Sequence, residues 1–215
     1  LMAYTFWSNV AVAGESALAS ALTISGITAA NPPVVSYTGT DPTNGDYVLL
    51  AVNGMYQLNG VVARVANVNG AGNTFELEGF NSTGYATFTS GTAQVITFGN
   101  TATNFVDVNP SGGEPEFADI TTIHQSIRTR VPVVTSPLTF SITGLFDSSD
   151  ALMADLAVAT RAIDTRCFRF TFSNGQKMVF NAYVSAPGVP TGSAQGAVQT
   201  PITLECQGLP TTYAT

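Results

Sequence analysis

Scarcity of charge is the feature that most limits what this chain can fold into. Only 10% of its 215 residues are Asp, Glu, Lys or Arg, whereas an ordinary soluble domain carries roughly a quarter. Its mean hydropathy is positive, yet the sequence has no run of about 18 apolar residues that could span a bilayer. A water-soluble chain with so few charges is expected to cover part of its surface with partner chains. The composition therefore predicts assembly and no membrane insertion.

The few charges are unevenly distributed. The formal net charge is −7, and residues 1–119 hold nine carboxylates and a single cation, Arg64. Lys177 is the only lysine of the chain. Since affinity for nucleic acid comes mainly from cations that neutralise phosphates, a DNA-binding domain is disfavoured. A channel that must not bind DNA tightly would carry a net negative charge, but many soluble proteins are negatively charged as well.

Strands and turns are favoured by the 20 glycines, 11 prolines and many Thr, Val, Ser and Asn residues. Between 23 and 98, short apolar runs alternate with turn signals such as Asp41-Pro42-Thr43-Asn44-Gly45. This spacing predicts a small β-barrel or sandwich of its own. Its expected strands are 24–27, 34–38, 47–52, 61–68, 75–77 and 94–98.

Two segments have helical spacing. The first covers 8–22 and has Ser8 as a possible N-cap, although Gly14 disfavours helix there. The second covers 148–163, where Asp147 or Ser148 is the expected cap. Its predicted buried face consists of Leu152, Leu156, Ala159 and Ile163.

Residues 100–115 are predicted to form a polar connection without regular structure, of a length that is usually functional or ordered by a partner. The remaining expected strands are 117–123, 138–142, the hairpin 166–172 with 177–184, and 201–206, which follows a Gly/Pro loop at 187–198. Together with the second helix they predict an α+β fold that is mainly β, in which one helix packs on a sheet.

The two cysteines are expected to be reduced thiols. Period-two alternation places Phe168 and Phe170 on the buried face of their strand and turns Cys167 outward with Arg169. Cys206 falls on the apolar face of the last strand. A disulfide between opposite faces is improbable, which fits synthesis in a reducing place. No charged segment followed by an apolar one begins the chain, so no signal peptide is expected.

A search for catalytic and metal-binding patterns is negative. His124 is the only histidine, and a zinc site needs three or four ligands, so a structural role is favoured for it. The sequence contains no Gly-x-Ser-x-Gly elbow and no phosphate-binding loop. A Cys–His nucleophile pair is disfavoured, although sequence alone does not exclude it. The chain is predicted to be no enzyme and to need no cofactor or metal.

Four carboxylates gather in and beside the 100–115 connection: Asp107, Glu114, Glu116 and Asp119. They lack the spacing of a calcium loop, so solvated or lumen-facing charge is the favoured interpretation. Arg128 and Arg130 lie two apart on an extended segment and share a face. They either form inter-subunit ion pairs with the acidic residues or are simply solvated, and both alternatives stay open.

Several motifs, in order, resemble the major tail tube protein of long-tailed, lambda-like bacteriophages. The resemblance covers about residues 1–22 and 100–215. It is carried by Phe117-Ala118-Asp119, Thr121-Thr122-Ile123-His124, Pro137-Leu138-Thr139-Phe140, the helix after Phe146-Asp147, Phe170-Thr171-Phe172-Ser173-Asn174-Gly175, Pro190-Thr191-Gly192-Ser193, Thr200-Pro201-Ile202-Thr203, Gly208-Leu209-Pro210-Thr211 and the start Ala3-Tyr4-Thr5-Phe6-Trp7-Ser8-Asn9.

The segment between these parts resembles a small β module found in phage structural proteins. It is also similar to the first catalytic-cysteine half-domain of ubiquitin-activating enzymes, but it contains no cysteine, so that activity does not carry over. The expected organisation is therefore a tube domain made of 1–22 and 99–215, with an inserted all-β domain at 23–98.

The resemblance implies a structural protein of the virion tail, made in the bacterial host cytoplasm. Homohexameric rings would join their sheets into a β-barrel around a lumen and stack head to tail into the tube for genome ejection. Implied partners are copies of the chain, the tail terminator and tail tip proteins, and the tape measure protein and DNA, which the lumen would hold without tight binding. The acidic residues would lie at contacts between rings or in the lumen. The inserted module would lie on the tube exterior or in its wall, and the helix at 148–163 would pack on the outside of the barrel.

Two other functions remain as alternatives. A tail decoration or receptor-binding module would expose aromatic or carbohydrate-binding loops, and a single tryptophan, Trp7, gives that function little support. A type VI secretion-like tube protein would share the ring architecture.

Overall fold

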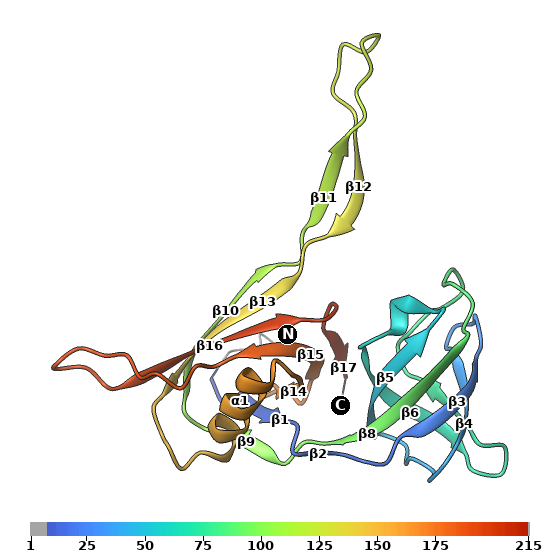
Figure 1. Cartoon of the computed structure of the whole chain (residues 1–215). Coiled ribbons are helices and arrows are strands. Elements are labelled where there is room, and N and C mark those ends of the chain that lie inside the picture. Colours follow the sequence, from blue (N-terminus) through green and yellow to red (C-terminus); the bar gives the residue numbers. More distant parts are fainter. Residues whose placement is uncertain (1–7, 215) are drawn as a thin grey trace.

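The computed structural model describes residues 8–214, which fold mainly into β-strands (Figure 1). A large antiparallel sheet has the order β10-β13-β16-β15-β14-β1-β9, and β17 also pairs with β15. Within the described residues one α-helix, α1 (Ala151–Ala162), accompanies this sheet. The predicted α+β class, mainly β with one packed helix, is confirmed. The strands are β1 (Ala11–Gly14), β9 (Asn100–Ala102), β10 (Phe105–Gly112), β13 (Leu138–Leu145), β14 (Thr165–Thr171), β15 (Lys177–Ser185), β16 (Gln199–Cys206) and β17 (Thr211–Tyr213).

One face of the large sheet is apolar and lies beneath α1. Leu152, Leu156 and Ala159 of the helix are fully buried, as their spacing predicts. On the sheet, the Phe180 ring stacks on the Phe140 ring with 4.9 Å between centroids. Phe168 and Phe170 of β14 also contact Phe180. This single core places α1 across the sheet and leaves the opposite face of β10, β13 and β16 uncovered by it.

The helix begins three residues later than the sequence predicts. Asp150 is the N-cap, and its carboxylate accepts hydrogen bonds from the backbone amides of Leu152 and Met153 at 2.8 and 3.1 Å. Asp147 instead accepts from the Ser149 amide and hydroxyl in the preceding turn, so the expected caps were wrong. Ile163 has a left-handed φ of 53° at the C-cap and is 81% exposed, so it does not belong to the buried face.

The cap can be tested by substitution. Asp150→Ala leaves two helix amides without their acceptor and should lower the free energy of unfolding by about 1 kcal/mol. Ser148→Ala is the matched control, because Ser148 is exposed and does not cap the helix. Chemical denaturation of both variants measures the difference. Equal losses in the two variants would contradict the assignment of the cap.

Six further strands close a small barrel. The strand order β2-β8-β3-β4-β7-β6-β5, with an additional β8–β5 pairing, forms a ring of β3 to β8. The expected barrel or sandwich is thus a barrel, filled by side chains such as Tyr37, Leu50 and Phe75. The six ring strands are β3 (Leu22–Ile27), β4 (Val34–Thr38), β5 (Tyr47–Asn53), β6 (Val62–Asn69), β7 (Thr74–Leu77) and β8 (Ser90–Thr97). The short β2 (Ala17–Leu18) pairs with β8 outside the ring, and a 3-10 turn, η1 (Tyr56–Leu58), follows β5.

The predicted helix at 8–22 is wrong. Its residues form β1, β2 and the start of β3. β1 is paired on both sides, by β14 and by β9. Val12 and Ala13 are both buried although they point to opposite faces, which shows that both faces of β1 are covered. Apolar side chains on both faces imitate helical spacing, and only tertiary pairing resolves the ambiguity.

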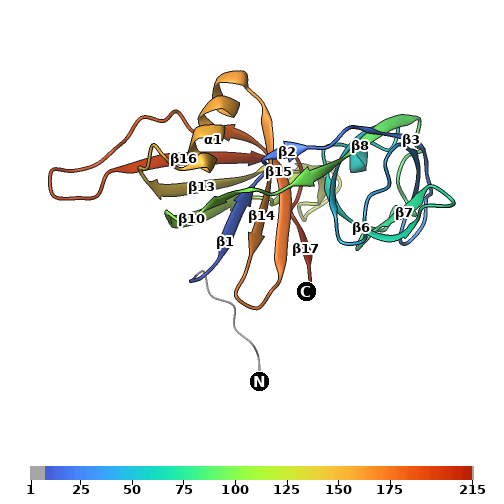
Figure 2. The same ribbon diagram turned by 90° about the horizontal axis from the view of Figure 1, so that it is seen from below.

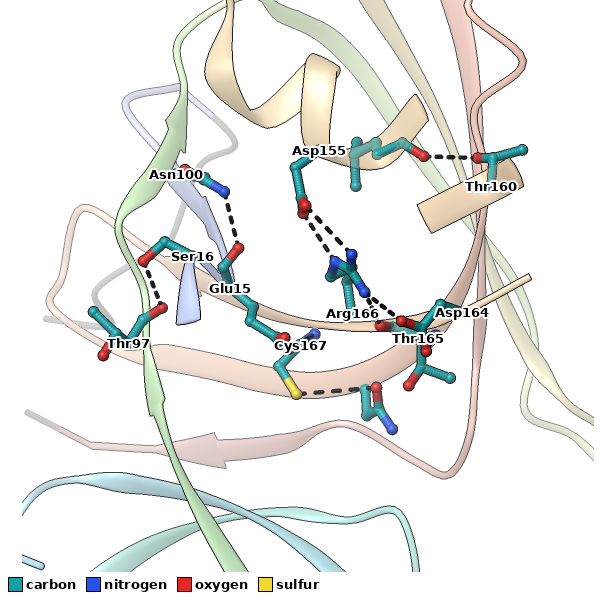
Figure 3. Close-up of polar contacts among 12 residues, drawn as sticks. Glu15, Ser16, Thr97, Asn100, Asp155, Thr160, Asp164, Thr165, Arg166 and Cys167 are labelled. Atoms are coloured by element: carbon teal, nitrogen blue, oxygen red, sulfur yellow. Dashed lines mark hydrogen bonds and ion pairs between the residues drawn. The ribbon is translucent and has the colours of Figure 1, made fainter. Parts of the chain in front are cut away.

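The chain enters and leaves the barrel at one place, where the two crossing segments are bonded to each other (Figure 3). The Ser16 amide and hydroxyl both donate to the Thr97 carbonyl, at 2.8 and 3.1 Å. The Asn100 side chain donates to the Glu15 carbonyl at 2.9 Å, and a Glu15 carboxylate oxygen accepts from the Cys167 amide at 3.1 Å. These contacts attach the barrel stem to β14.

A second contact joins the barrel wall to β17 and the residue that follows it. The Arg64 amide donates to the Tyr213 hydroxyl at 2.9 Å, and the Arg64 guanidinium lies 4.7 Å from the Tyr213 ring centroid while it pairs with Glu78. Arg64 also donates to the Ala214 carbonyl. Tyr47, Val62 and Ile96 of the barrel share a buried cluster with Cys167, Val179 and Tyr213 of the large sheet.

This contact corrects the expectation for Cys167. The second face of β14 is covered by the barrel, so Cys167 is fully buried and does not point to solvent. Cys206 is buried beneath the other face of the sheet, in the core with α1. Both thiols are free, as predicted. Burial raises the pKa of Cys206 to about 12 and that of Cys167 further.

The Arg64–Glu78 pair predicts a pH dependence of stability. The hydrogen bond from Arg64 lowers the pKa of Glu78 below its ordinary 4.5. A carboxyl whose folded pKa is depressed stabilises the fold above its unfolded pKa, and this contribution is lost as the pH falls through the folded pKa. Wild-type protein should therefore lose more stability than Glu78→Gln as the pH falls below 4.5. Parallel thermal unfolding curves at each pH would contradict this expectation.

Candidate assembly surfaces

A two-stranded arm projects from the large sheet (Figure 1). It consists of β11 (Pro115–Asp119), the tip 120–129 and β12 (Arg130–Thr135), and within residues 8–214 β11 and β12 pair only with each other. Every residue from 114 to 135 is exposed. Because an isolated two-stranded hairpin is at best marginally stable in water, the arm lacks the support that a second surface would supply.

The segment that leads to the arm is not the irregular connection that the sequence predicts. Residues 100–102 form β9 and residues 105–112 form β10, and these strands occupy opposite edges of the large sheet. Pro110 is tolerated because β10 is an edge strand. Gly112 and Gly113 have φ values of 85° and 78° where the ribbon leaves the body, and the Ser136 hydroxyl donates to the Glu114 carbonyl there. A Cβ on Gly112 would lie 2.0 Å from the Pro137 carbonyl oxygen, so only glycine fits.

The arm exposes large apolar side chains. Ile123 and Ile127 at the tip are 96% and 78% exposed, and Phe117, Ile120, Val131, Val133 and Val134 are also exposed. By contrast, across the described residues 8–104 Tyr56 is the one large apolar residue that is strongly exposed. The barrel surface is therefore suited to water, whereas the arm surface is typical of an interface.

The face of the large sheet opposite α1 is polar. Asp107 lies beside Thr143, and Asn109 beside Ser141, which in turn pairs with Thr203. Glu205 of β16 lies between Thr139 and Tyr183 on the same face. Asp107 and Glu205 are the charged residues of β10, β13 and β16. This surface combines small hydroxyl groups and negative charge with the exposed side chains of Leu145 and Tyr183, and it carries no cation on those three strands.

The structure separates the four predicted acidic residues into two groups. Asp107 belongs to the polar sheet face, whereas Glu114, Glu116 and Asp119 lie on or at the base of the arm. Hydrogen bonds from the Thr121 hydroxyl and amide lower the pKa of Asp119. Glu205 was missed as a member of the sheet-face group, although the alternation Ile202-Thr203-Leu204-Glu205 already places it opposite the buried residues.

Arg128 lies in the exposed arm tip, and Arg130 begins β12, where it is the cross-strand partner of Asp119. The intramolecular ion pairs of residues 8–214 involve Arg64 and Arg166 and neither of these two residues. Their inter-subunit ion pairs stay a prediction.

His124 is also at the exposed arm tip, so it is not a core histidine. Both cysteines are buried in the body, and the structure therefore brings no Cys–His pair together. Among residues 8–214 no group of three or more His, Cys, Asp or Glu side chains could hold a metal ion. The described part of the chain also contains no helix that is long and apolar enough to cross a membrane.

The comparison with known families identifies the class of protein. The model of the family described as "Phage tail tube protein, TTP" matches residues 53–215, and the chain belongs to this family. It is thus a structural protein of the phage tail tube, as the resemblance of its motifs implies. The match begins at the end of β5, so it includes part of the small barrel. No curated protein matches the chain.

The apolar arm tip predicts an assembly defect without a folding defect. Ile123→Asp combined with Ile127→Asp should change the free energy of unfolding of the free subunit by less than about 0.5 kcal/mol, because both side chains are exposed. The same variant should lose tube formation in electron micrographs. Tyr56→Asp, on the barrel, is the matched control and should assemble normally. Normal tubes from the isoleucine variant would contradict an interface at the tip.

Proposed function

We propose that copies of this chain form homohexameric rings that stack head to tail into the tail tube, through which DNA is ejected into the host. The observation that carries the proposal is the exposed apolar arm of 114–135, which no other part of the described residues 8–214 covers. A projection whose receiving surface lies elsewhere on the molecule makes a heterologous contact, and repetition of such a contact builds an open filament. Family membership supports a tube as that filament.

Ring closure is supported by the edges of the large sheet. In the described chain β10 and β9 end the strand order, so each has one side without a strand partner. Edge strands are templates for pairing with another chain. We propose that six copies join these sheets side by side around the lumen, with β10 and β9 near the subunit boundaries.

The polar sheet face is proposed as the lumen surface. Its carboxylates, Asp107 and Glu205, repel phosphates, so DNA and the tape measure protein would slide past without tight binding. On this arrangement Glu114, Glu116 and Asp119 belong to contacts between rings, where Arg128 and Arg130 are their expected partners. The helix α1 then lies on the outer side of the tube wall.

The small barrel is proposed as an inserted module on the outside of the tube. The bonded stem between 15–16 and 97–100 supports an insertion between 22 and 99, which leaves 1–22 and 99–215 as the tube domain. The barrel surface exposes few large apolar side chains, as expected for a part that remains in water. The ring ends would contact the tail terminator and tail tip proteins, and the host cytoplasm is the proposed site of synthesis.

Electron microscopy of purified protein tests this proposal. Rings or tubes with six-fold rotational averages are expected. Persistent monomers at high concentration would overturn it and favour a tail decoration or receptor-binding module. Detection of the chain in tubes purified from a phage lysate would favour a tail tube over a type VI secretion-like tube.

Charge reversal separates the two acidic surfaces. Asp107→Lys with Glu205→Lys should leave tube formation intact but slow genome ejection, because cations in the lumen would hold phosphates. Lysine substitutions at Glu114, Glu116 and Asp119 should instead weaken ring stacking. The rate of DNA release from virions and the yield of tubes are the two readouts, and Glu76→Lys on the barrel is the control. Unchanged infectivity of both multiple variants would contradict both assignments.

A further inference from the structure

A groove lies beside α1, at the end of the large sheet that is farthest from the arm. It has a volume of about 210 Å³ and is lined by Phe146, Met153, Ala157, Arg161, Ala186 and Thr200. We call it the α1 groove. The arm leaves the body before Leu138, the first residue of β13, whereas Phe146 follows Leu145, the last. The eight residues of β13 separate the two surfaces by about 25 Å, at about 3.3 Å per residue, and Figure 1 shows the arm and α1 on opposite sides of the sheet.

The groove contains a polar group without a partner. The Thr200 hydroxyl is buried, and no hydrogen-bond partner for it is present among the described residues. Leaving such a group unpaired costs about 1–3 kcal/mol. Since the groove walls are otherwise mostly apolar, a suitable occupant would supply both apolar side chains and one hydrogen-bonding group.

The arm tip has this combination. Ile123 and Ile127 are the most exposed apolar side chains of the arm. His124 and Gln125, which lie between them, carry hydrogen-bonding side chains, and Arg128 follows. Asp147 and Ser148 also line the groove, so that the Asp147 carboxylate can face that cation and offset the charge of Arg161 in the same lining. The tip projects roughly 30 Å beyond Gly113, at about 3.3 Å per extended residue, so it cannot fold back into the groove of its own chain.

We propose that the α1 groove receives the arm tip of the next copy in the stack, with Ile123 or Ile127 in the apolar part and the Thr200 hydroxyl bonded to the tip. This proposal rests on the proposed function and names the receiving surface of the stacking contact. A second hollow, lined by residues of 135–138 and 205–209, lies at the base of the arm. That hollow is at the same end of the subunit as the projection, whereas head-to-tail stacking needs the receiving surface at the opposite end.

Disulfide trapping in assembled protein tests the pairing. Ile123→Cys is combined with Ala154→Cys, an exposed position that lines the groove. The two native thiols are buried and do not interfere. Mild oxidation of tubes should convert most of the protein into a ladder of cross-linked copies on a non-reducing gel. Ile123→Cys with Tyr56→Cys, on the barrel, is the matched control and should give no ladder.

The outcomes distinguish a failure of the groove assignment from a failure of the proposed function. The groove assignment is overturned if the Ile123→Cys/Ala154→Cys variant forms tubes but gives no ladder. It is also overturned if the Ile123→Cys/Tyr56→Cys variant gives a ladder. Neither result contradicts the proposal that the chain forms a tube. If wild-type protein forms no tubes, the proposed function fails and the pairing fails with it. If the cysteine pair itself prevents assembly, the Ala157→Tyr variant is the deciding test, because the tyrosine should fill the groove. This variant should form no tubes, whereas the unfolding temperature of its subunit should equal that of the wild type. Normal tubes from Ala157→Tyr overturn the proposal.

Discussion

The one-sided burial of the large sheet is the constraint on which the other features depend. The cluster of Phe140, Phe168, Phe170 and Phe180 binds α1 to one face. The helix cannot cover both faces, so the strands β10, β13 and β16 present hydroxyl groups, Asp107 and Glu205 on the other. The same core sets the direction of β10 and β13, and therefore the direction in which the arm leaves the body. The packing of α1 on one face of the sheet thus accounts for the polar surface on the other face, and for the arm and the α1 groove at opposite ends of the sheet.

The exposed apolar side chains of this poorly charged chain are unevenly distributed over the fold. Apart from Tyr56, the large exposed apolar side chains of residues 8–214 lie in 105–214. They are on the arm, on α1 and its C-cap, and on the 187–198 loop, which projects from the sheet (Figure 2), and also at Val106, Leu145, Phe146, Tyr183 and Leu209. The barrel exposes mainly Thr, Ser, Asn and Gly residues. If the first group is covered by copies of the chain, as proposed, few charges are needed to keep the subunit in water, because little of that surface stays exposed in the tube.

The barrel is held to the sheet by two unlike contacts. One is the bonded stem at Glu15, Ser16 and Asn100, and the other is the cluster around Arg64 and Tyr213. Two separate attachments restrict rotation about the stem, so the barrel has a defined position relative to the sheet. The stem is further tied to the helix, because Arg166 of β14, next to Cys167, pairs with Asp155 of α1 at 3.0 Å (Figure 3).

Local patterns were sufficient for much of the fold. The barrel strands, the 166–184 hairpin and the buried face of α1 follow from period-two or helical spacing and from turn residues, which act over a few positions. The sequence also determined that the cysteines remain free and that phosphate-binding cations are scarce, and its motifs pointed to the tail tube family. For the candidate surfaces, it supplied the acidic residues but not their division between sheet face and arm.

Only the tertiary structure decided the features that depend on contacts between distant segments. Residues 8–22 became strands because β14 and β9 pair with β1, and residues 105–112 became an edge strand because β13 supplies its backbone partners. Cys167 is buried because the barrel, far along the chain, covers it. A hydrogen-bonded sheet and a packed face are made by residues far apart in sequence, so their spacing along the chain carries no direct signal of which partners will meet.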